Sequence, residues 1–121
     1  MTAEELMSGN WWLVRAIYPV ACDASINEVF ESDEDPLNKV DYANELREEC
    51  VDSFGYLDDF NYDEDSYDSE EEQYDVWYRD QLDAISLESE RITEQTIDKY
   101  GLEWLNSVIF NGRLYRRYVC R

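Results

Sequence analysis

Eleven acidic side chains and no basic side chain lie between Asp52 and Asp75, a stretch of 24 residues. Six aromatic residues are interleaved with these acids, whereas disordered acidic linkers are poor in aromatic residues. Because crowded like charges oppose a compact state, the fold must keep these acids at its surface. Residues 56–72 read as an acidic loop, and we expect the whole stretch to form an ordered or partly ordered acidic surface. A mobile loop is the alternative.

The charge of the chain is unevenly distributed. The 121 residues include 30 acids, 10 bases and no histidine, for a formal charge of -20. Residues 1–50 carry a net charge of -9, residues 51–90 of -14 and residues 91–121 of +3. Since 44% of the residues are apolar, the chain can bury a core, and we expect a single domain spanning residues 1–121. This asymmetry predicts one acidic face anchored on a nearly neutral scaffold.

Several functional classes are excluded or disfavoured by composition. Without histidine, catalysis by Ser-His or Cys-His pairs is excluded, and we expect a protein that is not an enzyme and needs no cofactor. Nucleic acid and anionic lipid would both be repelled, so no direct contact with either is expected. Cys22, Cys50 and Cys120 lack the paired spacing of a disulfide framework or a zinc site. They indicate reduced thiols and a cytoplasmic location.

The first 22 residues predict a short helix followed by a strand. Thr2 and Glu5 have the spacing of a capping box, which favours a short helix before Gly9. Residues 11–22 are rich in aromatic and β-branched side chains and are expected to form a strand. Pro19 has no N–H group, so this strand is expected at a sheet edge or with a bulge.

Two helices are expected next. Asp23 or Ser25 can cap a short helix that places Ile26, Val29 and Phe30 on one face. Pro36 suits a first helical turn, and apolar residues then recur every three or four positions, which predicts an amphipathic helix over residues 36–54. These recurring residues are Leu37, Val40, Ala43, Leu46 and Cys50.

The remaining elements complete an α+β fold. Residues 74–85 fit a helix, although Tyr74, Val76 and Tyr78 also alternate as in a strand. Residues 93–100 predict a short helix that Gly101 closes. Residues 105–110 and 113–119 flank an Asn-Gly pair, a strong hairpin signal. We therefore expect a small antiparallel sheet, made of the N-terminal strand and this C-terminal hairpin and covered by helices. The basic residues of the expected hairpin, Arg113, Arg116 and Arg117, are available to pair with acids of the chain.

One segment imitates a calcium-binding loop. The residues Asp59, Asn61, Asp63, Asp65 and Glu70 have the ligand spacing of an EF-hand. Glu64 stands where the sharp turn requires glycine, and Ser66 where an apolar residue should pack. We therefore expect no specific metal site, only weak cation binding.

The acidic stretch is the candidate partner-binding surface. Its acids and rings are expected to contact a basic partner, and no residue is expected to be catalytic. The candidate residues are Asp58, Asp59, Tyr62, Asp63, Glu64, Asp65, Tyr67, Asp68, Glu70, Glu71, Glu72, Tyr74 and Asp75.

The charge density of such a surface approaches that of DNA. A chain of this mass exposes roughly 6,900 Å², so the 27 acids of residues 1–90, spread over half of it, have about 130 Å² each. Duplex DNA presents one phosphate per about 110 Å² of its surface. In size, acid excess and the run FGYLDDFNYDEDSYDSEEEQYD, the chain resembles small acidic phage-encoded DNA-mimic inhibitors, the anti-CRISPR and anti-restriction proteins.

This resemblance implies a stoichiometric inhibitor of a nucleic-acid-processing host defence complex, acting in the cytoplasm of an infected bacterium. The implied partner is a basic nucleic-acid-binding protein, such as a Cas effector or a restriction enzyme, whose DNA-binding site the acidic surface would block. Two alternatives stay open: an immunity protein or antitoxin that neutralises a basic nuclease toxin, and an acidic chaperone of basic proteins. The residues leave the oligomeric state open.

Overall fold

A four-stranded antiparallel sheet organises the chain, and the computed structural model describes residues 1–19, 24–54 and 69–117. The helical elements of these ranges are α1 (Ala3–Ser8), the 3-10 helix η1 (Pro36–Asn38), α2 (Val40–Phe54), α3 (Glu70–Ala84), α4 (Glu94–Tyr100) and α5 (Leu102–Asn111). The strands are β1 (Trp11–Tyr18), β2 (Ala24–Glu31), β3 (Ser86–Arg91) and β4 (Leu114–Arg117). The expected α+β class is confirmed. No helix in the described ranges has the length and apolar character needed to cross a membrane.

The first strand lies inside the sheet, where the sequence had predicted an edge or a bulge. The strand order is β3-β1-β2-β4, so β1 pairs on both sides, with β2 and with β3. The prediction from Pro19 is wrong because β1 ends at Tyr18, and the proline follows the last paired residue. The missing N–H group therefore removes no bond from the ladder.

Alternate side chains of β1 enter two separate cores on the two faces of the sheet. Val14, Ala16 and Tyr18 belong to the core that α2 covers, together with Leu46 and Cys50 of that helix. The intervening residues point to the other face, where a second core is formed with α1 and α5. Its buried members are Leu6, Leu13, Val29, Ile92, Leu105 and Val108.

The residues expected to form a helix after Ser25 form strand β2 instead. Ile26 lies on the face covered by α2, and Val29 lies on the opposite face. A strand buried on both faces shows no clear alternation, so the three- and four-residue spacing was misleading. The polar Asn27 is fully buried within β2, where its amide donates to the carbonyl oxygen of Leu114 at 3.3 Å.

The prediction of a C-terminal hairpin is also wrong. The residues before Asn111 form helix α5, and the single strand β4 pairs with β2. Gly112 has a φ of 76° and ends the helix, donating its N–H to the carbonyl oxygen of Ile109 at 3.2 Å. Glycine after the last helical residue is a common helix end, so Asn-Gly is ambiguous between a helix end and a hairpin turn. Arg113 does pair with acids of the chain, namely Glu28 and Glu45.

The other helices follow their sequence signals. The capping box of Thr2 and Glu5 is present at the start of α1. The helix predicted over residues 36–54 is present from Val40 to its predicted end at Phe54, but Pro36 opens the separate 3-10 helix η1, and Lys39 divides the two. Val40 is an exception, because it is 68% exposed although its spacing placed it with the apolar residues. Strand β3 had no counterpart among the predicted elements.

Candidate functional site

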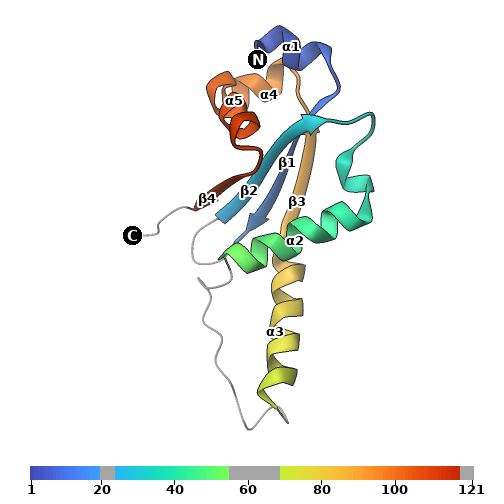
Figure 1. Cartoon of the computed structure of the whole chain (residues 1–121), viewed down its shortest axis with the longest axis vertical. Helices are drawn as coiled ribbons and strands as arrows, with labels where there is room; N and C mark the ends of the chain where they lie inside the picture. The colour runs from blue at the N-terminus through green and yellow to red at the C-terminus, as the bar shows by residue number, and fades with distance from the viewer. Residues whose placement is uncertain (20–23, 55–68, 118–121) are drawn as a thin grey trace.

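Helix α3 projects from the body of the protein and is fixed mainly through its C-terminal half. In Figure 1 it extends beyond α2, away from the end of the sheet that carries α1, α4 and α5. The buried hydroxyl of Tyr18 donates to Oε1 of Gln81, and the hydroxyl of Tyr78 donates to Oδ1 of Asp52 at 3.3 Å. Tyr78 and Leu82 pack against the core under α2. None of the 15 residues of α3 is fully buried, so most of its surface faces solvent.

The projecting helix carries a dense row of acids. Six of its residues are acidic and exposed, and one, Arg79, is basic. These acids are Glu70, Glu71, Glu72, Asp75, Asp80 and Asp83. At 1.5 Å per residue the helix is about 22 Å long, so one acid occurs per about 3.7 Å of its axis. Among the described residues, none of these six acids forms an ion pair.

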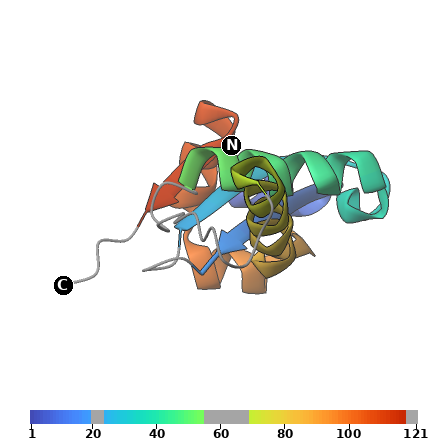
Figure 2. The same ribbon diagram turned by 90° about the horizontal axis from the view of Figure 1, so that it is seen from below.

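Helix α2 adds a second row of acids that crosses the first. It carries Asp41, Glu45, Glu48, Glu49 and Asp52, opposed within the helix by Arg47 alone. Figure 2 looks from below, so that α3 is seen nearly end-on in front of α2. A hollow of about 540 Å³ lies between the two helices, with Glu48 and Asp83 on opposite walls. The acids of α2 and α3 are hereafter called the acidic helix pair.

Aromatic rings lie among the acids of α3. The ring of Tyr74 is 5.5 Å from that of Trp77 and 6.2 Å from that of Tyr78, between ring centroids. Tyr74 is 45% exposed and is available for contact with a partner. Burial, together with the neighbouring carboxylate of Asp52, raises the pKa of Tyr78 to about 12, so this hydroxyl stays protonated and donates at neutral pH.

The acids at the two ends of α3 differ in their effect on the helix. Glu70, Glu71 and Glu72 lie in the first turn, where the positive end of the helix dipole favours negative charge, and Ser69 caps that turn. Asp83 lies in the last turn, where the dipole opposes negative charge and where the helix has no basic residue. The first-turn acids support the helix, whereas Asp83 has no such structural role.

The structure brings together part of the predicted surface. Glu70, Glu71, Glu72, Tyr74 and Asp75 lie exposed on the first two turns of α3. The other predicted residues, from Asp58 to Asp68, lie outside the described residues. The calcium-like spacing falls largely there as well, with only Glu70 placed. In the ranges that the structure describes, no three acids or cysteines are grouped so as to hold a metal ion.

The sequence reasoning missed the acids of α2 and the C-terminal acids of α3. It confined the candidate residues to a continuous acidic run, whereas the exposed acids of α2 are scattered among apolar residues. These acids occur on the exposed side of a helix whose apolar side had been identified correctly. Helical periodicity applied to Asp41, Glu45, Glu48 and Asp52 would have predicted a common acidic side.

Comparisons with protein-family models, with curated proteins and with solved structures gave no match to this chain.

Proposed function

We propose that this protein is a stoichiometric, non-catalytic inhibitor that occupies the DNA-binding site of a basic nucleic-acid-processing protein. The acidic helix pair takes the place of DNA phosphates in that site. The partner is a host defence enzyme or complex of the CRISPR effector or restriction type, and the protein acts in the cytoplasm.

The spacing of acids on α3 carries this proposal. One acid occurs per about 3.7 Å of the helix axis. One strand of duplex DNA carries one phosphate per about 3.4 Å of its axis. A groove whose arginine and lysine side chains meet one DNA strand therefore meets a similar mean density of carboxylates along α3, although successive acids of the helix lie between about 1.5 and 7.5 Å apart along its axis.

Repulsion among the acids of α3 in the unbound protein supports the same proposal. The acids of α3 repel one another and make no ion pair among the described residues, and this mutual repulsion opposes the favourable dipole effect of the first-turn acids. Binding to a basic groove replaces this repulsion with attraction, and it also accelerates association at low salt. A surface that served only solubility would not require Asp83 in the last turn of a helix, where it opposes the dipole.

The test is displacement of DNA from a Cas effector complex and from a restriction enzyme, measured by gel shift and fluorescence anisotropy. The wild-type chain is expected to displace DNA, and DNA bound beforehand should slow its association. A variant of α3 with Glu71→Gln, Asp75→Asn, Asp80→Asn and Asp83→Asn should lose at least tenfold in apparent affinity at low salt, and less at high salt.

A matched control variant removes the same charge from the other end of the molecule. It carries Glu4→Gln, Glu94→Gln, Asp98→Asn and Glu103→Gln, all at exposed positions of α1, α4 and α5. If net charge alone determined binding, both variants would weaken equally. A ternary complex with DNA and this protein bound together at full affinity would contradict the proposal.

A further inference from the structure

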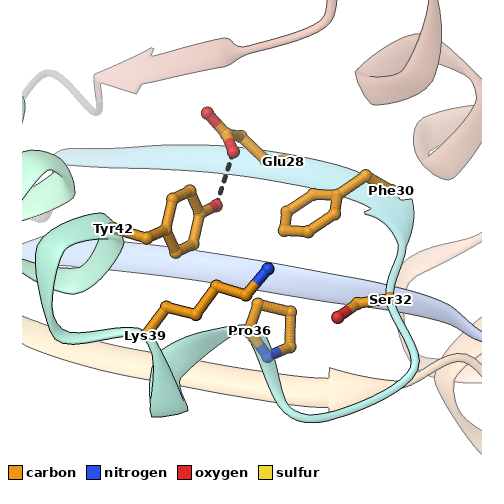
Figure 3. A pocket seen from close by; sticks show the side chains of 6 residues that line it. All are labelled: Glu28, Phe30, Ser32, Pro36, Lys39 and Tyr42. Atoms are coloured by element: carbon orange, nitrogen blue, oxygen red, sulfur yellow. Dashed lines mark hydrogen bonds between the residues drawn. The ribbon is translucent and has the colours of Figure 1, made fainter.

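A pocket opens on the α2 side of the sheet, between β2, η1 and the first turn of α2. It has a volume of about 280 Å³ and is lined by Glu28, Phe30, Ser32, Pro36, Lys39 and Tyr42. Figure 3 shows the rings of Phe30, Tyr42 and Pro36 forming its walls. Phe30 and Tyr42 meet edge to face, with their centroids 5.6 Å apart. Such a pocket is large enough for one side chain and too small for most drug-sized ligands.

The one carboxylate in the pocket is already engaged by the protein itself. Oε1 of Glu28 accepts from Nε of Arg113, and its Oε2 accepts from the hydroxyl of Tyr42 at 2.5 Å. Glu28 is also largely buried, with 12% of its side chain exposed. The carboxylate is thus neutralised and held in place, so it offers little attraction to an additional cation. The pocket itself therefore favours an apolar occupant.

Lys39 is the movable wall of the pocket. Figure 3 shows its side chain extending between Tyr42 and Pro36 toward the interior. Lys39 is exposed, and its ammonium forms no ion pair or hydrogen bond with the part of the chain that the structure describes. An entering ring can displace this side chain to solvent without breaking an interaction within these residues.

Acids border the pocket on both sides. Asp41 and Glu45 line an adjoining hollow of about 510 Å³, which also exposes Val40. On the opposite side, Asp33 and Glu34 are exposed in the turn between β2 and η1. Charge complementarity therefore favours basic residues on either side of whatever enters the pocket.

We infer that this pocket receives one aromatic side chain of a partner segment in which basic residues flank that ring. The inference deepens the proposed function and rests on it for the identity of the partner, since it places an anchor at the N-terminal end of α2, one of the two acidic helices. Buried aromatic anchors surrounded by a charged rim commonly dominate binding at protein interfaces. The acids alone attract any basic surface, and the pocket would select a segment of defined sequence.

The test titrates the isotope-labelled full chain with three blocked tripeptides, Lys-Phe-Lys, Lys-Ala-Lys and Lys-Arg-Lys, by NMR. We expect the phenylalanine peptide to bind at least fivefold more tightly than the alanine peptide, with the largest shifts at Phe30 and Tyr42. Higher salt should weaken both peptides but preserve their ratio, because burial of the ring is not screened. Equal binding of these two peptides, or shifts at Phe30 and Tyr42 as large with the arginine peptide as with the phenylalanine peptide, would overturn the inference.

Two substitutions of Lys39 give opposite results with the same change of charge. Lys39→Ala opens the pocket and should retain or increase the preference for the phenylalanine peptide. Lys39→Trp supplies a ring from the chain itself and should abolish the preference. Equal preference in the two variants would also overturn the inference. Because these titrations use the chain alone, a failure of DNA displacement with the preference intact would reject only the proposed function.

Discussion

The hydroxyl of Tyr78 on α3 donates to Oδ1 of Asp52 on α2 at 3.3 Å, and this bond joins the two acidic helices. Asp52 lies in the C-terminal half of α2, and Tyr78 lies in the C-terminal half of α3. The bond requires Tyr78 to be protonated, and burial together with Asp52 favours the protonated form. The attachment of α3 is therefore sensitive to alkaline pH.

We predict that part of the folding stability is lost at alkaline pH through Tyr78. Its pKa in the fold is about 12, against 10.0 for an ordinary tyrosine. Because the pKa in the folded state is raised, the contribution is complete below pH 10 and is lost as pH rises from about 10 through 12. The free energy of unfolding, measured with urea from pH 8 to 11, should decline less steeply with pH for Tyr78→Phe than for the wild type. Identical slopes would show that Tyr78 does not titrate in this way.

Substitutions at the two ends of α3 should have effects of opposite sign. Asp83→Asn removes a negative charge from the last turn and should raise the free energy of unfolding by about 0.3–1 kcal/mol. Glu71→Gln removes one from the first turn and should lower it by a similar amount. Each variant loses one charge, so relief of general repulsion is common to both. Thermal and urea unfolding at low salt measure the difference, and equal shifts would argue against a dipole effect.

Breaking the ion pair between Arg113 and Glu28 should be costly. Arg113 is 24% and Glu28 is 12% exposed, and removal of the arginine leaves a carboxylate confined without its cation. Arg113→Met should therefore destabilise the fold by about 2–3 kcal/mol, less than the ~3–5 kcal/mol for fully buried ion pairs because both side chains keep some contact with solvent. Adding Glu28→Gln to that variant should recover part of the loss. An additive double variant would show that the two side chains do not interact.

The end of α5 should be sensitive to any side chain at position 112. Gly112 has a φ of 76°, and a Cβ atom built there meets nothing within 4 Å. The cost of Gly112→Ala therefore comes from the backbone conformation alone, and we expect a loss of about 1 kcal/mol in unfolding free energy. Gly112→Asn should cost about as much, because asparagine is tolerated in the left-handed helical region, whereas Gly112 has a ψ of -56°, outside that region. Equal stability of the wild type and the alanine variant would contradict the observed φ.

The elements predicted correctly are those whose signals are local. The Thr2–Glu5 capping box and the apolar spacing of α2 depend on contacts within one helix, and both are confirmed. The character of β2 depends on residues far along the chain, because Asn27 is satisfied by Leu114 and Ile26 packs under α2. No local pattern contains that information, so helical spacing was mistaken for a helix.

The same distinction holds for the candidate site. The acidic run identified Glu70 to Asp75 as candidate residues, but residues 70–72 were read as part of a loop, whereas α3 begins at Glu70. The crossing of α3 over α2 is a tertiary relationship, and the composition of residues 41–52 did not reveal it. The pocket at Phe30 and Tyr42 combines β2 with α2, and it was unpredictable once β2 had been assigned as a helix.

Because β1 lies inside the sheet, one of its edges stays unpaired during part of the protein's synthesis. Its partner β2 begins at Ala24, whereas its other partner β3 begins only at Ser86. During synthesis we therefore expect a β1–β2 ribbon to exist while the other edge of β1 has no partner yet to pair with. Such open edges promote aggregation of nascent chains. The residues made in this interval are the most acidic of the chain, so two unfinished molecules repel each other until the sheet is complete.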